Sequence, residues 1–429
     1  MKKIVLILPL VALSLSVVAQ APMTLVQAQH YAVEHNINLK IAEESNASTR
    51  QDRTEAVASL FPSLSASSSI SNSYGRSIDP ETNTYTTVGN ISNSYSISSY
   101  LTVFSGLTTI NALKASRLKM EMGGHSFEQQ KDAVELNVMQ LYFDVLYYAA
   151  SIEIVGEQKI AAEKVFELTE KQAELGVKSA ADVALSASQV ASHDLLLTQQ
   201  EGLHSQAMLS LKEAMNFPFE EKLVLSDENS TEPTIITNVL NIETNPEYQT
   251  ALSQLDLSHT NLRIARGSYA PTFAIGAGYN NYYYASLADG YTATPFNEQI
   301  KTNYGYYIGA SLSIPIFNNL SYRTAVARSR HSLRIAELEL QRTEIRVKKA
   351  ANEALLSRNN SLKEQQSAAT KIDAAEMSNS AMQKKYEQGA ASIIDLQSTS
   401  NELLKARAEE LRAKFNYHIE NHLVKYYFK

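Results

Sequence analysis

The sequence predicts a mixed α and β membrane protein, built as an internal two-fold repeat, with two bilayer-length strands and one long helical hairpin in each half. Three observations lead to this prediction. Four segments alternate between small polar and more apolar residues, two long proline-free segments carry heptad spacing, and the second half repeats the first at a nearly constant offset.

The alternating segments are the expected strands, because successive side chains of a strand point to opposite faces of a sheet. In the first, serines occupy every second position from Ser63 to Ser73, and Leu64 and Ile70 stand between them. Each segment reaches the roughly 9–11 residues that a tilted strand needs to cross a bilayer. Alternation alone also permits two soluble hairpins. The expected strands are 62–74, 90–104, 271–284 and 303–316.

The N-terminus predicts an export signal over residues 1–20. Lys2 and Lys3 precede the apolar stretch 4–18, and the small residues Ala19 and Ala21 offer two cleavage positions. A retained signal anchor is the alternative. No later run of about 18 apolar residues follows, so we expect no transmembrane helix in the mature chain. An exported chain whose membrane-length elements are strands is typical of the bacterial outer membrane.

The internal repeat sets the expected domains. Phe61 to Leu64 align with Ala270 to Phe273 at an offset of 209, and Gly176 aligns with Gly389 at an offset of 213. Each half begins with a helix, expected at 24–60 and 246–269, which Pro62 and Pro271 close before a strand begins. The expected parts are a first repeat at 21–216, an equatorial linker at 217–244 and a second repeat at 245–429.

The long helical hairpins are expected at 105–216 and 317–424. Apolar residues recur at spacings of three and four from Val134 to Val155, and one heptad apart from Val326 to Ala354. That seam packs by knobs into holes, and the first helix of each hairpin would be roughly 100 Å long. Gly123 and Gly124 are interpreted as a kink or join. A cytosolic coiled coil is the alternative, but it does not explain the signal or the strands.

Four strands per chain cannot form an open sheet in hydrocarbon, because every backbone donor and acceptor there needs a protein partner. Closure must therefore come from several copies. A barrel needs at least eight strands, so two copies are the minimum, and three or four are also possible. Small Ser and Gly side chains cannot fill a 12-stranded barrel, so its lumen would hold water.

Composition argues against other function classes. The formal net charge is -7, and no basic patch interleaved with aromatics predicts a nucleic-acid partner. There is no cysteine, hence no disulfide or thiolate metal site. No Gly-rich phosphate loop follows a strand. His418 and His422 lie four residues apart, but we interpret them as exposed helical histidines rather than ligands. We expect no cofactor and no catalytic site.

The ordered set of motifs resembles the TolC family, the outer membrane factors of tripartite efflux pumps and type I secretion systems. The resemblance covers essentially the whole mature chain. It rests on the strand starts at Pro62 and Pro271 and on the two helical turns. It implies a homotrimer with one 12-stranded barrel, set in outer-membrane lipid, and a periplasmic tunnel of 12 helices.

The family's function would make the chain a passive exit duct for small molecules or polypeptides. Its partners would be a periplasmic adaptor and an inner-membrane pump of the RND, ABC or MFS type. An envelope-spanning structural or adhesion trimer without conduction is the alternative.

The turns between the long helices are the candidate site. Ser179 with Asp182, and Ser392 with Asp395, form capping boxes with Asp in place of Glu. The resemblance implies a periplasmic gate in which Asp182 links to Tyr386, while a ring of Asp395 narrows the entrance. Ser398 and Ala391 replace a second ring acid and a loop arginine of the family's pattern. The turns expected to dock the adaptor comprise Leu175, Gly176, Val177, Lys178, Ser179, Gly389, Ala390, Ala391 and Ser392.

Overall fold

The computed structural model describes residues 22–79, 83–226 and 240–428. The expected export signal lies outside these residues, as does part of the expected linker. The mixed helix and strand organisation is confirmed. In chain order the elements are α1 (Leu25–His35), α2 (Ile37–Ala58), β1 (Ser63–Ser73), β2 (Ser77–Ile78), β3 (Tyr85–Thr86), β4 (Asn90–Ser105), α3 (Thr108–Glu174), α4 (Ala180–Met215), the 3-10 helix η1 (Ile242–Thr244), α5 (Pro246–Gly267), β5 (Thr272–Ser286), α6 (Phe296–Thr302), β6 (Tyr304–Ser313), α7 (Ser321–Glu387) and α8 (Ile393–Tyr427).

The chain forms two compact units. The strand unit comprises residues 41–129 and 241–349, and the hairpin unit comprises the described residues of 1–40, 130–240 and 350–429. The helices α3 and α7 run through both ranges, and each is 67 residues long. At 1.5 Å per residue this corresponds to about 100 Å.

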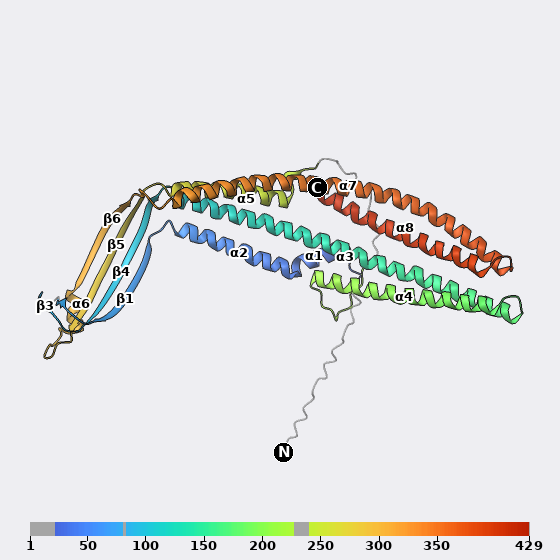
Figure 1. Ribbon diagram of the computed structural model, residues 1–429, viewed down its shortest axis with the longest axis horizontal. Coiled ribbons are helices and arrows are strands. Elements are labelled where there is room, and N and C mark those ends of the chain that lie inside the picture. Colours follow the sequence, from blue (N-terminus) through green and yellow to red (C-terminus); the bar gives the residue numbers. More distant parts are fainter. Residues whose placement is uncertain (1–21, 80–82, 227–239, 429) are drawn as a thin grey trace, which may run out of the picture. The chain divides into compact units, whose positions relative to one another are not determined.

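Four long antiparallel strands make up the sheet of the strand unit, in the order β1-β4-β5-β6 (Figure 1). They lie close to the ranges that the alternation predicted. The pairs Ser69↔Ser94 and Ser94↔Tyr282 fix one face, and Ile97↔Tyr279 and Tyr279↔Tyr306 fix the other. The outer strands β1 and β6 each pair with one neighbour in the described part of the chain.

The two faces of the sheet differ in chemistry. On the first, the serine face, hydroxyls of β1 and β4 pair across the strands, from Ser65 with Ser98 (3.0 Å) to Ser71 with Ser92 (2.7 Å). Glycines of β5 and β6 continue this face. The second, the apolar face, carries Leu64, Ile97, Ile275, Ile308 and Leu312. The four strands contain no Asp, Glu, Lys or Arg.

The junctions between helices and strands reproduce the repeat. Pro62 and Pro271 each stand directly before a strand, after α2 and α5 have ended. Beyond the second strand of each pair, Gly106 and Leu107 adopt positive φ angles of 63° and 64°. Their counterparts at an offset of 213, Asn319 and Leu320, have φ of 53° and 63°. The same left-handed turn therefore leads into α3 and α7.

One expectation about the helices is wrong, and one of the two alternatives at Gly123 and Gly124 is excluded. The helix expected at 24–60 is interrupted at Asn36, whose side-chain oxygen accepts hydrogen bonds from the backbone N–H of Asn38 and Leu39 (2.8 and 3.3 Å) and so begins α2. Gly123 is not a join, because α3 continues through it. A Cβ there would lie 2.2 Å from the Asn46 side-chain oxygen, so this glycine lets α2 approach α3 closely.

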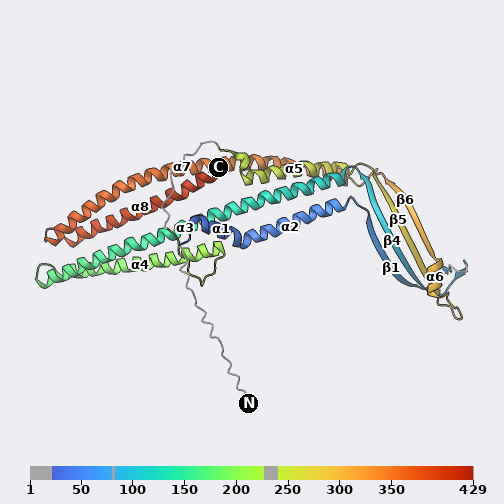
Figure 2. The ribbon, with the colours of Figure 1, turned by 180° about the vertical axis from the view of Figure 1, so that it is seen from behind.

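The hairpin unit contains two helical hairpins, α3 with α4 and α7 with α8 (Figure 2). The heptad seam of α3 is buried in this unit at Val138, Val145 and Val155, each at most 3% exposed. Ion pairs join the helices of each hairpin, Lys159 with Asp194 and Lys371 with Glu409. The seam is the packed core that its spacing predicted.

The first ten residues of the expected linker, 217–226, belong to the hairpin unit and pack against the end of α4. Phe217 and Leu223 are buried, and the Lys212 ammonium donates to the carbonyl oxygens of Phe219 and Glu221 (2.9 and 2.6 Å). Residues 217–226 are thus fixed to the end of α4. Of the described helices, α3 alone includes a stretch long and apolar enough to cross a membrane by composition, a property that helices packed inside a protein share.

The close approach of two backbone segments at Gly106 and Gly267 in the strand unit gives a test. A Cβ on Gly106 would lie 2.2 Å from the Gly267 carbonyl oxygen, and its φ of +63° is unfavourable for other residues. We expect Gly106→Ala to lower the free energy of unfolding by more than about 2 kcal/mol, because a left-handed conformation alone costs roughly 1–2 kcal/mol. Thermal melting in detergent, followed by circular dichroism, measures this.

The matched control is Gly309→Ala on β6, where a Cβ would meet nothing within 4 Å. It should change the stability by less than about 1 kcal/mol, since only the strand propensity changes. Equal melting temperatures for the two variants would contradict the close approach at Gly106.

Candidate functional site

The candidate site lies where each long hairpin reverses, at the turn between α3 and α4 and at the turn between α7 and α8. Gly176 and Gly389 have φ of +77° and +74°, and neither would bring an added Cβ within 4 Å of another atom. The backbone conformation, not lack of space, therefore requires glycine.

The backbone bonds of the two turns match. The N–H of Val177 donates to the Gln172 carbonyl (2.8 Å), and the N–H of Ala390 donates to the Lys385 carbonyl (2.8 Å). This is the Schellman pattern, in which a left-handed residue lets the chain satisfy the last carbonyls of a helix. Leu175 and Val177 leave apolar side chains 79% and 62% exposed at the first turn.

Both expected capping boxes are present. One Asp182 carboxylate oxygen accepts bonds from the N–H and hydroxyl of Ser179 (2.9 and 2.8 Å), and the Asp182 N–H donates to the Ser179 hydroxyl oxygen (3.2 Å). Asp395 repeats all three bonds with Ser392. The two acids thus begin α4 and α8 by satisfying free backbone donors.

These bonds hold the pKa of Asp182 and the pKa of Asp395 below the usual range. For Asp182 the main cause is the backbone bond from Ser179, and for Asp395 it is the Ser392 hydroxyl. A lowered pKa in the folded state means that the caps stabilise the helices above the ordinary carboxyl pKa near 4, and that this stabilisation is lost as the pH falls through the lowered value. Both acids are charged at neutral pH.

Tyr386 is fully buried between the two hairpins. Its hydroxyl lies 2.5 Å from the Thr169 hydroxyl of α3, and Thr169 in turn donates to the Val165 carbonyl (2.7 Å). Because its own hydrogen is directed to Val165, the Thr169 hydroxyl oxygen accepts a hydrogen bond from the Tyr386 hydroxyl. Ile393 and Leu396 of α8 complete a cluster with this ring, against which side chains of α3 and α4 also pack.

Lys178 makes a second link between the hairpins. Its ammonium lies 4.6 Å from the centre of the Tyr386 ring and donates to the Ala391 carbonyl oxygen of the other turn (3.3 Å). A cation over an aromatic face and a charge-assisted bond both stabilise this contact. We call Thr169, Lys178, Tyr386 and the Ala391 carbonyl the turn latch.

The expected link between Asp182 and Tyr386 is not formed within the chain. The Tyr386 hydroxyl is hydrogen-bonded to Thr169, and the Asp182 carboxylate is hydrogen-bonded to Ser179. Burial is the main cause that raises the pKa of Tyr386, and the charge of Asp182 raises it further, so the hydroxyl stays protonated. The role of Asp182, Tyr386 and Asp395 as a gate stays a prediction. Thr169 was missed because a single Thr in a helical seam carries no distinguishing sequence signal.

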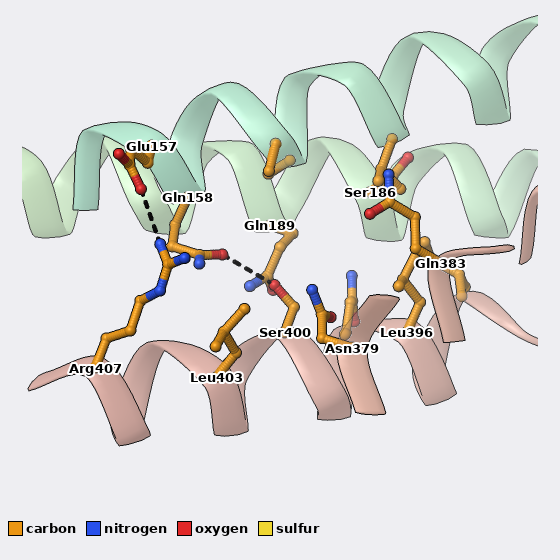
Figure 3. Close-up of a pocket in the computed structure, with 15 residues that line it drawn as sticks. Glu157, Gln158, Ser186, Gln189, Asn379, Gln383, Leu396, Ser400, Leu403 and Arg407 are labelled. Carbon is orange, nitrogen blue, oxygen red and sulfur yellow. Dashed lines mark hydrogen bonds and ion pairs between the residues drawn. The ribbon is translucent and has the colours of Figure 1, made fainter. Parts of the chain in front are cut away.

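A cavity of about 250 Å³ with both polar and apolar lining lies between the hairpins, next to the turn latch. Figure 3 shows Gln158 bonded to Ser400 (3.3 Å) and Arg407 paired with Glu157 (2.8 Å) across it. Arg407 also binds Glu376 on α7 (2.9 Å), so one guanidinium holds two helices. Amide side chains, including Gln189, Asn379 and Gln383, make up much of the remaining wall.

The interpretation of His418 and His422 as exposed histidines is wrong. Phe143 of α3 lies against both rings, with ring centres 6.0 and 5.8 Å apart. Burial, the largest cause, lowers the pKa of His422 to about 4, so this imidazole is neutral at pH 7. Among the described residues, no group of three or more His, Asp or Glu side chains is arranged to hold a metal ion.

The sequence matches the family model of the outer membrane efflux proteins at residues 29–216 and 240–424, one match in each repeat. It is 23% identical over 304 residues to outer membrane protein TolC of Escherichia coli (strain K12). That alignment covers 68% of this chain and 60% of TolC, so it spans less than two thirds of its relative.

Several solved structures share the fold. CusC superposes with a TM-score of 0.83 at 14% identity, over 94% of this chain and 91% of CusC. The CmeC outer membrane channel of Campylobacter jejuni superposes with a TM-score of 0.83 at 16% identity, over 94% of this chain and 85% of CmeC. VceC of Vibrio cholerae superposes with a TM-score of 0.80 at 13% identity, over 94% of this chain and 95% of VceC.

The family match covers both halves of the chain, including the turns and the strands described above. The chain therefore belongs to the outer membrane efflux protein family, and it resides in the bacterial outer membrane with its helical part in the periplasm.

Proposed function

We propose that this chain is one subunit of a homotrimeric exit duct, which conducts small molecules or polypeptides passively from the periplasm to the exterior. A periplasmic adaptor and an inner-membrane pump of the RND, ABC or MFS type would deliver the cargo. The observation that carries the proposal is the uncharged four-stranded sheet with two open edges, one serine face and one apolar face.

The open edges support assembly. In hydrocarbon an unpaired peptide group costs several kcal/mol, so β1 of one copy must pair with β6 of another. Three copies supply 12 strands, an even number within the range of bacterial barrels. The apolar face would then contact lipid, and the serine face would line a lumen too wide for Ser and Gly side chains to fill.

The helical turns support an adaptor-bound, gated entrance. Two hairpins per chain end in turns that are fixed by caps, and the first of these turns leaves Leu175 and Val177 exposed. The turn latch joins the two hairpins of one chain, so opening would require its bonds to break. Asp182 and Asp395, which stay charged at neutral pH, are proposed to supply the ring of negative charge at the entrance.

Reconstitution into planar bilayers tests the conduit itself. A duct gives discrete single-channel steps, and a structural or adhesion trimer gives none. A trimer that inserts into the bilayer without conducting would overturn the proposed function.

The gate gives the next prediction. Tyr386→Phe removes the bond to Thr169, and Asp182→Ala removes a cap and one charge, so each should raise single-channel conductance. Tyr322→Phe is the matched control, because it makes the same change near the other end of α7 and should leave conductance unchanged. Wild-type conductance in both test variants would remove these residues from the gate.

The docking turns give a prediction that separates charge from backbone strain. Asp and Asn have nearly the same shape and both tolerate positive φ better than other non-glycine residues. We expect Gly176→Asp or Gly389→Asp to abolish crosslinking to the adaptor, because the added charge lies where the exposed turn would be covered.

The matched controls Gly176→Asn and Gly389→Asn should crosslink nearly as well as wild type, and all four variants should still assemble as trimers. Crosslinks are placed through a single cysteine at Ala390, since the natural chain has none. Undiminished crosslinking by the Asp variants would show that the turns are not the docking surface.

A further inference from the structure

The short helix α6 lies on the apolar face of the sheet, at the end that connects β5 to β6. Phe296 packs against Tyr95 of β4 and Tyr283 of β5, with ring centres 6.2 and 5.5 Å away. The register places both tyrosines on the face that carries Ile97 and Ile275. The helix is therefore on the opposite side of the sheet from the paired serines.

Gln299 fixes α6 to the sheet by completing an open strand edge. Pairing with β6 ends at Asn281, so β5 continues beyond its neighbour. There the Gln299 side-chain oxygen accepts from the Tyr284 N–H (2.9 Å), and its NH₂ group donates to the Tyr284 carbonyl (2.7 Å). The amide satisfies the same two groups that a paired strand would, and Gln299 is 3% exposed.

A second anchor lies three residues back along β5. The Asn281 side chain donates to the Ile300 carbonyl of α6 (2.6 Å) and to the Tyr279 hydroxyl (3.2 Å), and it is buried. Phe296 itself remains 50% exposed although it touches two rings. The helix is thus held firmly while presenting an aromatic side chain outward.

The height of α6 along the sheet agrees with a membrane boundary. From Phe273 to Tyr283, β5 rises about 34 Å along its own axis. At the usual tilt of about 40° this corresponds to roughly 26 Å along the membrane normal, close to the 25 Å height of the apolar band of outer-membrane barrels. Phe296 meets Tyr283 at the upper edge of that band, where aromatic girdles form.

We propose that α6 is an interfacial anchor, which lies outside the barrel wall and places Phe296 among the lipids of the outer leaflet. The exposed Glu298 and Lys301 give the helix a polar side for the headgroup region. This inference rests on the proposed function, because it requires the apolar face to point outward. The other possible location, inside the lumen, would make α6 a constriction at the mouth.

The absence of tryptophan from the natural chain allows a direct test. Phe296→Trp introduces one fluorophore, which is measured in the full assembled chain reconstituted into phosphatidylcholine vesicles with and without brominated acyl chains. Tyr306→Trp and Tyr307→Trp are the controls, since these neighbours of β6 occupy the apolar and serine faces. Acrylamide reports access to water.

We expect brominated lipid to quench Phe296→Trp and Tyr306→Trp, and to leave Tyr307→Trp nearly unquenched. Acrylamide should quench Tyr307→Trp most strongly. Releasing the anchor by Gln299→Ala in the Phe296→Trp background should reduce lipid quenching and shift the emission to longer wavelength.

The controls separate the two possible failures. Lipid quenching of Tyr306→Trp without quenching of Phe296→Trp would overturn the anchor and leave the barrel in place. Quenching of Tyr307→Trp instead of Tyr306→Trp would put the serine face outward and α6 inside, which contradicts the proposed duct as well. If Phe296→Trp does not assemble, a nitroxide on Phe296→Cys measures the same contrast through its accessibility to oxygen and to a water-soluble nickel complex.

Discussion

An unpaired backbone edge inside a membrane is the constraint from which the rest of this structure follows. Water at a surface can satisfy the free N–H and C=O groups of an edge strand, and hydrocarbon cannot. The outer strands β1 and β6 each carry such an edge. At one place the chain satisfies such an edge itself, because the Gln299 amide bonds to the N–H and C=O groups of Tyr284, where β6 is no longer paired. In the proposed duct, the remaining edges would pair with other copies of the chain.

A second constraint is the duplicated backbone path. Left-handed residues recur at an offset of 213, as Gly106 with Asn319 and Gly176 with Gly389, and the helices between them have equal lengths. The two hairpins consequently reverse at equivalent positions. The side chains have diverged on this common path, because Tyr386 corresponds to Ala173 and Lys178 to Ala391. The turn latch therefore joins different side chains that lie on two equivalent backbone turns.

Sequence patterns predicted most of the fold because the pertinent physics is local and periodic. Strand alternation, heptad spacing, prolines before strands and the Ser-x-x-Asp caps each act over a few residues. The break at Asn36, the role of Gly123 and the burial of His422 depend instead on segments far away in the chain. The small elements β2, β3 and α6 were also missed, because each is too short to show a period.

The site follows the same division. The capping boxes could be read from residue types three positions apart, and the structure reproduces every bond of both. The partner of Tyr386 could not be predicted from the sequence, because Thr169 lies 217 residues earlier and an apolar seam surrounds it. The resemblance to the family implied that Asp182 would be the partner of Tyr386. In this chain the Asp182 carboxylate is already bonded to Ser179, and the buried Thr169 hydroxyl accepts the hydrogen bond of Tyr386.

The paired serines carry a consequence for transport. Hydroxyls at 65, 67, 69 and 71 are already bonded to hydroxyls of β4, and the four long strands contain no Asp, Glu, Lys or Arg. In the proposed duct, these paired hydroxyls would offer few free hydrogen-bonding groups to cargo, and uncharged strands would not enrich one sign of salt. Selection among cargo molecules would then have to be complete before they reach the strands, and the strand-lined part of the duct would be non-selective.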